Sequence, residues 1–328
     1  MEEFRAIDFP RARNFSRKLN ATFEFIRQNF KPLFKSILFI AGPSVLVGSV
    51  MAGSFMGEFF SLGLSMQGNP EALSSYFLST GFWTQLLLMF IFLTISFVIA
   101  IATINCYLIL YDQKKTNKIE VSEVWDHVRN ALGSYLGTTL LFFLLFLIAY
   151  VILLIPVFIL SNISGVLVFF GVLFTVAGIF FLIFSSSLTY FIQLYEKKNF
   201  IDAIARSFRL VNSGKWWSTF GLIMILYLIM MTVSYVFILP YYAVLFTESL
   251  HSISSGTVAE PSPSGKYWTI FFFTLYYMAQ MLLYALPNVG IAFQYFNLVE
   301  LKEAKGLMNQ IENLGESSAP VNRPDEHY

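Results

Sequence analysis

The residues that could carry catalysis or bind a metal are few in this chain, and they are widely spaced. The three histidines, His127, His251 and His327, lie far apart, which argues against a multi-histidine iron or zinc site within one chain. Cys106 is the only cysteine, so an internal disulfide and a cysteine-based metal cluster are excluded. We therefore expect no metal and no cofactor.

Two short motifs suggest a nucleophile or a nucleotide site, but neither has the partners that such chemistry needs. Ser185, Ser186 and Ser187 supply hydroxyls near the end of an apolar run, where no base is expected within reach. Gly265-Lys266 lacks the upstream glycine spacing and the following Ser or Thr of a phosphate-binding loop. We expect the chain not to be an enzyme, and the serines to pack between helices or satisfy backbone groups.

The elements that must position these residues are strongly apolar. Hydrophobic residues make up 56% of the chain and charged residues 12%, against about 25% charged in a typical soluble protein. This composition excludes a soluble enzyme, a disordered chain and a nucleic-acid-binding protein, and it predicts a multi-pass membrane protein. The charge-free runs cover residues 36–56, 72–111, 130–195, 216–247 and 267–299.

The lengths of these runs predict six membrane-spanning helices. A hydrocarbon core about 30 Å thick needs about 20 apolar residues, so run 130–195 is too long for one crossing. The turn-forming cluster at 161–165 divides that run into a hairpin. The expected spans are 36–56, 82–111, 135–160, 166–194, 216–247 and 267–299, in an all-α polytopic fold.

The distribution of basic residues predicts the orientation of the spans. Of the 21 Lys and Arg residues, all except Lys266 fall on the side that holds both termini. Basic residues favour the cytoplasmic side, so both termini are expected there. The chain then divides into a cytoplasmic N-terminal segment (1–35), a membrane domain (36–299), and a cytoplasmic helix with a disordered tail (300–328).

An amphipathic segment precedes each odd-numbered span. Phe15, Leu19, Phe23, Ile26 and Phe30 recur at a helical period in the first segment, and similar periods follow Val121 and Ile201. We expect three cytoplasmic interfacial helices, and a pseudo-threefold repeat in which each helix leads into a hairpin of two spans. Any six-span protein with cytoplasmic linkers would share part of this pattern.

Two stretches of sequence carry a resemblance to a known group of proteins. The first runs from Tyr195-Glu196-Lys197-Lys198 through Arg206–Val211 to Lys215-Trp216-Trp217 and Phe220-Gly221, and the second covers 23–33. The text resembles the membrane domain attached to some bacterial glycerophosphoryl diester phosphodiesterases, and related stand-alone six-span inner-membrane proteins. The resemblance implies the architecture and a bacterial inner-membrane location. It does not imply the phosphodiesterase activity, which belongs to a separate soluble barrel that has no room in this chain.

Three sets of residues are candidates for binding or packing. A basic and aromatic set is expected at lipid headgroups, although the same residues would serve membrane topology alone: Lys197, Lys198, Arg206, Arg209, Lys215, Trp216 and Trp217. Ser44, Gly48 and Ala52 form a small-residue stripe that predicts close approach of a helix from this chain or from a partner. Asn105, Gln280 and Asn288 either join neighbouring helices or line a polar cavity for a lipid or small solute.

These expectations favour a non-catalytic membrane subunit that assists an envelope complex or organises lipid. The alternative is a passive or partner-energised carrier of a lipid or another amphipathic molecule, with helices bent by prolines around a cavity. The expected partners are the phospholipid bilayer and other membrane proteins, with no nucleic acid and no metal.

Overall fold

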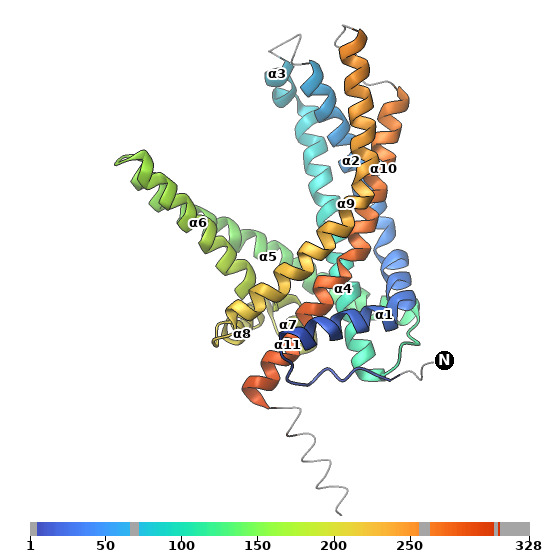
Figure 1. Cartoon of the computed structure of the whole chain (residues 1–328), viewed down its shortest axis with the longest axis vertical. Helices are drawn as coiled ribbons and strands as arrows, with labels where there is room; N and C mark the ends of the chain where they lie inside the picture. The colour runs from blue at the N-terminus through green and yellow to red at the C-terminus, as the bar shows by residue number, and fades with distance from the viewer. Residues whose placement is uncertain (1–4, 66–71, 256–262, 305–307, 309–328) are drawn as a thin grey trace, which may run out of the picture.

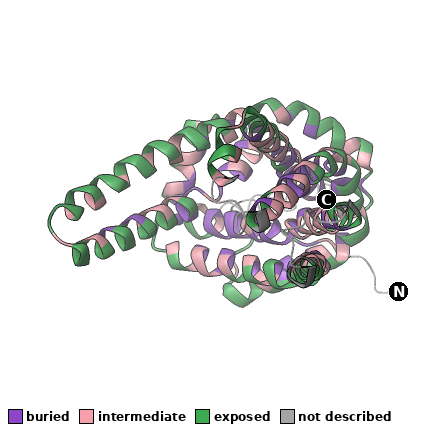
Figure 2. Cartoon of the chain, turned by 90° about the horizontal axis from the view of Figure 1, so that it is seen from above, coloured by how far each residue is buried: buried purple, intermediate pink, exposed green. Residues whose placement is uncertain are grey.

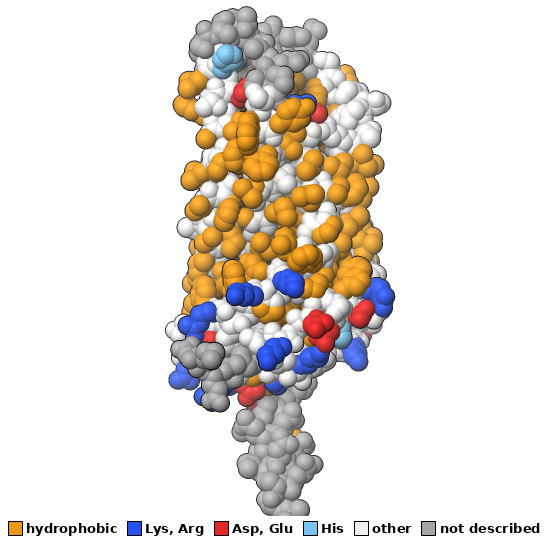
Figure 3. Space-filling model, turned by 90° about the vertical axis from the view of Figure 1, so that its right-hand side faces the viewer, with side chains coloured by type: hydrophobic (Ala, Val, Ile, Leu, Met, Phe, Trp, Pro, Cys, Tyr) orange, Lys and Arg blue, Asp and Glu red, His pale blue; other side chains and the backbone are white. Residues whose placement is uncertain are grey.

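The protein is an all-α polytopic membrane protein. The computed structural model describes residues 5–65, 72–255, 263–304 and 308, and all regular structure in these residues is helical. Six helices or helix pairs are long and apolar enough to cross a membrane. Figure 3 shows a band of apolar side chains, with Lys and Arg side chains gathered below it, at the end where Figure 1 shows α8 and the last turns of α11. We call this end the basic end.

The helices follow one another with short connections. They are α1 (Phe15–Ile40), α2 (Gly42–Ser65), α3 (Ala72–Leu78), α4 (Thr80–Lys114), α5 (Val121–Ser161), α6 (Gly165–Ser185), α7 (Thr189–Tyr195), α8 (Phe200–Val211), α9 (Trp216–Ser255), α10 (Pro263–Leu283) and α11 (Ala285–Glu303). The spans are Gly42–Gly63, Thr80–Lys114, Val121–Ser161, Gly165–Tyr195, Trp216–His251 and Ser264–Glu303.

The predicted number of spans is confirmed, while several boundaries differ. The first span starts at Gly42 because α1 runs on to Ile40 and breaks at Ala41, just before Pro43. Proline is tolerated in the first turn of a helix, where its missing N–H has no intrahelical partner. The expected hairpin turn lies between α5 and α6, where Ser164 caps α6 by accepting a hydrogen bond from the Val166 amide.

The expected interfacial helices differ from one another in the structure. Only α8 is a separate helix, because Asn199 caps its start and Gly214, with φ +80°, turns the chain beyond its end. The second segment is the beginning of α5, a continuous helix of 41 residues. The first segment is part of α1, which continues through Pro32. The threefold repeat stays a prediction. The second span of the second hairpin is interrupted at 186–188, and the second span of the third hairpin is interrupted at Tyr284. The corresponding span of the first hairpin, α4, is continuous.

The first part of α1 exposes both aromatic and charged side chains. Phe23 and Phe30 are exposed beside Arg27 and Lys31, while Phe25 and Leu33 are buried in the core. Lys18, Thr22 and Asn29 are also buried. An outer face that carries both rings and cations suits a helix at the edge of a bilayer, where apolar chains and headgroups meet.

The α5–α6 hairpin diverges from the rest of the molecule. Helices α2, α4, α9 and α10 run side by side along the long axis, while the hairpin leans away from them (Figure 1) and is mostly exposed (Figure 2). The most apolar 18-residue window of α5 holds no buried residue. Its two helices approach closely at Gly171 and Gly178, and between them Thr175 Oγ1 donates to the Leu153 carbonyl at 2.8 Å.

A strap of extended chain before α1 closes the basic end. The Ile7 amide donates to Tyr111 Oη at 2.9 Å, and the Arg13 amide donates to Asn297 Oδ1 at 2.7 Å. Between these bonds the Phe9 side chain is 1% exposed. Its ring contacts the rings of Phe25, Tyr111, Phe293 and Phe296, which belong to α1, α4 and α11.

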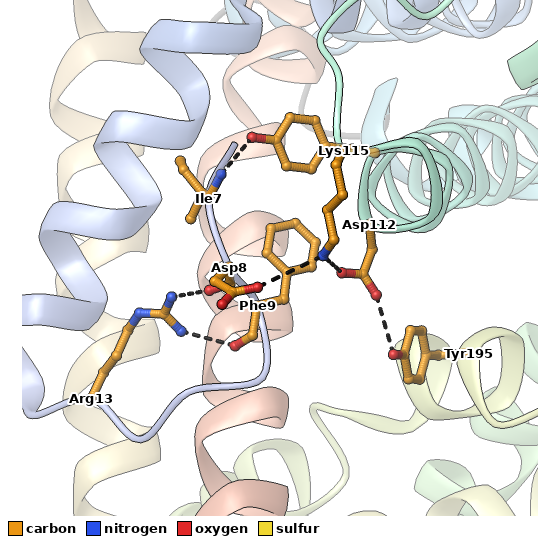
Figure 4. Close-up of polar contacts among 8 residues, drawn as sticks. Ile7, Asp8, Phe9, Arg13, Asp112, Lys115 and Tyr195 are labelled. Atoms are coloured by element: carbon orange, nitrogen blue, oxygen red, sulfur yellow. Dashed lines mark hydrogen bonds and ion pairs between the residues drawn. The ribbon is translucent and has the colours of Figure 1, made fainter. Parts of the chain in front are cut away.

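Charged side chains reinforce the strap at its surface. The Arg13 guanidinium donates to the carbonyls of Asp8 and Phe9, and Lys115 Nζ lies 2.7 Å from Asp112 and 4.0 Å from Asp8 (Figure 4). Tyr195 donates to the other oxygen of Asp112 at 3.2 Å, which ties α7 to α4. The strap has no signal in the sequence, because residues 5–14 show no helical period.

We expect the change Phe9→Ala to destabilise the fold by about 3–5 kcal/mol, because it removes a buried ring and leaves a cavity among four aromatic residues. The measurement is thermal unfolding in detergent, where Phe9→Ala should lower the midpoint by many degrees. Phe39→Ala is the control, since Phe39 is 63% exposed on the apolar surface. Equal midpoints for the two variants would show that the strap does not hold the basic end.

Candidate functional site

The candidate site is a cavity of about 650 Å³ that lies among the spanning helices, where the α5–α6 hairpin separates from α4, α9 and α11. Its size is within the usual range of small-molecule pockets, about 300–1,000 Å³. The lining residues are Phe90, Thr94, Phe97, Ile101, Asn105, Thr139, Leu140, Phe142, Phe143, Phe146, Ile183, Phe184, Ser186, Ser187, Tyr190, Phe191, Ile223, Tyr227, Tyr284, Asn288 and Ile291. All of them are uncharged, and aromatic residues predominate.

Hydrogen bonds between helices fix the polar part of this lining. Asn105 Nδ2 donates to Tyr135 Oη at 3.0 Å, and Tyr135 Oη donates to the Tyr190 carbonyl at 2.9 Å. Asn288 Nδ2 donates to the Tyr284 carbonyl one helical turn earlier, and Tyr227 Oη donates to Tyr284 Oη at 3.3 Å. Asn105 therefore joins α4 to α5 and also lines the cavity, whereas the hydrogen bond of Asn288 stays within its own helix.

A second cavity of about 260 Å³ lies next to the first and holds the third predicted polar residue, Gln280. Phe97, Tyr227 and Tyr284 line both cavities and form the wall between them. The structure thus places Asn105 and Asn288 in the lining of the first cavity and Gln280 in the lining of the second.

The serine cluster lies at the break between α6 and α7. Ser186 and Ser187 line the larger cavity, and their hydroxyls donate to carbonyls of the last turn of α6. Ser207 Oγ donates to the Ser185 carbonyl at 2.7 Å, so α8 covers this break. These bonds satisfy backbone groups that the interruption of the helix sets free. The expectation that the chain is not an enzyme stays a prediction.

The small-residue stripe on α2 is covered by a helix of the same chain. A Cβ atom at Gly48 would lie 3.3 Å from Leu93 Cδ2 and 3.3 Å from Ser96 Oγ, both on α4. Ala52 is buried and Ser44 is half-buried. The stripe is therefore a site where α2 packs against α4.

The predicted headgroup residues divide into two groups. Lys197, Arg209, Lys215 and Trp217 are exposed at the basic end. Trp216 is half-buried, and its ring stacks on Phe220 at 5.3 Å. Lys198 and Arg206 are instead held in ion pairs within the protein.

Glu196 is the centre of these ion pairs. Its carboxylate lies 3.1 Å from Arg206 and 2.7 Å from Lys198, and it accepts a hydrogen bond from Tyr295 Oη at 2.7 Å. Arg206 also pairs with Glu303 at the end of α11. Burial alone would raise the pKa of Glu196, but the hydrogen bonds from Lys198, Tyr295 and Arg206 hold it below its usual value. The bond to Glu303 raises the pKa of Arg206, so the whole group is charged.

Lys18 is a buried cation on α1, next to the apolar positions of the first amphipathic segment. Its side chain is 1% exposed, and Nζ donates to Gln294 Oε1 at 2.6 Å and to Ser218 Oγ at 2.9 Å. Burial and the nearby charge of Lys215 lower the pKa of Lys18 to about 8. A single sequence holds no signal for this, because the partners come from α9 and α11.

A search of family models, curated proteins and solved structures found no match to this chain.

We expect Arg206→Gln to destabilise the protein by about 2 kcal/mol, because it leaves Glu196 and Glu303 without their shared charged partner. Arg209→Gln, on the exposed side of the same helix, is the matched control and should leave the unfolding midpoint unchanged. Thermal unfolding in neutral detergent measures both variants. In vesicles that contain anionic lipid, only Arg209→Gln should weaken lipid binding. If only Arg206→Gln weakened it, the assignment of Arg206 to the internal ion pairs and of Arg209 to the lipid headgroups would be wrong.

Proposed function

We propose that the protein holds an amphipathic, lipid-like molecule in the cavity between the α5–α6 hairpin and helices α4, α9 and α11, and passes it on within the membrane. The observation that carries the proposal is the cavity itself, with its aromatic and amide lining. A site in the spanning part of the molecule, beside a hairpin with few neighbours, is open to molecules that arrive through the bilayer.

The setting of this site is also part of the proposal. We infer a bacterial inner membrane with both termini in the cytoplasm, because the basic residues gather at the end that holds the start of α1 and the end of α11. The resemblance to the membrane domain of glycerophosphoryl diester phosphodiesterases supports the same location. The outward Phe23 and Phe30 favour an α1 that lies along the headgroups.

A second candidate is a non-catalytic membrane subunit that docks a partner through the α5–α6 hairpin. The hairpin exposes aromatic side chains such as Phe170 and Phe174 along α6. Helix packing in membranes depends on such surfaces when a complementary helix is present.

We expect Thr94→Trp to expel the bound molecule, because the indole would occupy part of the cavity. Overpacking of about 1–3 kcal/mol corresponds to a loss of affinity of about 5- to 150-fold. The measurement is mass spectrometry of the lipids retained by the purified chain. Thr84→Trp is the control, since Thr84 is exposed on the same helix, outside the cavity lining. Equal retention by the two variants would refute a ligand in this cavity.

For the second candidate, we expect the chain to co-purify with a membrane partner in mild detergent. The double change Phe170→Ala/Phe174→Ala should release that partner, because it removes two exposed rings from α6. Phe246→Ala, an exposed ring on α9, should retain it. Repeated recovery of the unmodified protein as a lone monomer would count against a subunit function.

A further inference from the structure

The lining of the larger cavity restricts the charge of its ligand. Neither this cavity nor the smaller one beside it is lined by Asp, Glu, Lys, Arg or His. Transfer of an ionised group into such a site costs several kcal/mol unless an opposite charge meets it. Ion pairs among the described residues lie instead at the basic end, for example around Glu196 and Asp112.

The polar groups of the lining are suited to a neutral hydrogen-bonding group. Tyr284 Oη accepts the proton of Tyr227, which leaves its own proton for another acceptor. Asn105 and Asn288 each use one N–H in the bonds described above, and an amide has a second N–H and a carbonyl oxygen. A hydroxyl can accept from such an N–H or O–H and donate to an amide oxygen, and an ester or ketone carbonyl can accept from them.

The positions of the lining residues give the site a direction. Along α4 the lining runs from Asn105 to Phe90, about 22 Å at 1.5 Å per residue. Asn105 is the end nearer the basic end of the molecule. At the Phe90 end, the lining of α5 is also aromatic, with Phe143 and Phe146. The site therefore has a polar end and an apolar end, like the molecule that it would hold.

We infer that the cavity takes an uncharged lipid, with its hydroxyl or carbonyl group against Asn105, Tyr284 and Asn288 and its chain along α4 toward Phe90. This inference rests on the proposed function and names the ligand class of the same site. Phe97, Tyr227 and Tyr284 form the wall against which the polar group lies, because they separate the two cavities.

The test compares two probes that share an oleoylglycerol body and differ by one charged phosphate group. Monooleoylglycerol and oleoyl lysophosphatidic acid, each with a photoreactive diazirine on the chain, are added to the full-length protein in nanodiscs. Monooleoylglycerol should label peptides that contain Phe90, Phe143 or Phe146, and lysophosphatidic acid should label them about tenfold less, because its phosphate would be buried without a partner.

Variants of the polar end locate the head of the probe. Tyr284→Phe removes one hydroxyl with little change of shape and should weaken labelling by monooleoylglycerol about 3- to 10-fold. Asn288→Leu should act in the same direction. Asn162→Leu, at the exposed tip of the hairpin, is the control and should label as the unmodified protein does.

The outcomes separate the inference from the proposed function. Equal or stronger labelling by lysophosphatidic acid would overturn the inference and leave a lipid site in the cavity. Labelling by neither probe at these peptides would overturn both. The ratio of labelling by the two probes on the unmodified protein shows whether the cavity disfavours a charged lipid. This ratio can be measured even if a variant fails to fold.

Discussion

The hydrocarbon interior of a bilayer offers no partner to a polar group, and this constraint orders the whole molecule. Backbone groups are paired within helices, and where a helix breaks, as between α6 and α7, serine and threonine hydroxyls take the free carbonyls. Apolar side chains cover the outside of the spans, as on α6, where Phe170 and Phe174 are exposed. Amide side chains within the spans, such as those of Asn105 and Asn288, are buried.

Most of the charge-bearing structure lies at the basic end. Helices α1, α4, α7, α8 and α11 are joined there by three sets of contacts. These are the strap around Phe9, the ion pair between Lys115 and Asp112, and the group around Glu196. Away from this end the helices separate into an upright group and the α5–α6 hairpin (Figure 1). The cavity lies where the α5–α6 hairpin separates from α4, α9 and α11. The ion pairs around Asp112 and Glu196 lie outside the cavity, at the end where the helices are joined.

The class of the protein was predictable from its sequence. Composition and the length of charge-free runs reflect the thickness of a bilayer, so the number of spans followed without any knowledge of contacts. The small-residue stripe at Gly48 was also visible as a close approach of helices. Asn105, Gln280 and Asn288 stood out because amides are rare in apolar runs.

The sequence by itself determined which segments enter the membrane and which end carries the charge, because both depend on the local balance of polar and apolar residues. The tertiary structure decided which partner each polar side chain or backbone group binds. Arg206 and Arg209 lie three residues apart on α8, yet one is held between two carboxylates and the other is exposed. The Arg13 amide meets Asn297 across 284 residues of chain. Such pairings depend on how the helices pack together, and no periodicity along one segment encodes the position of another.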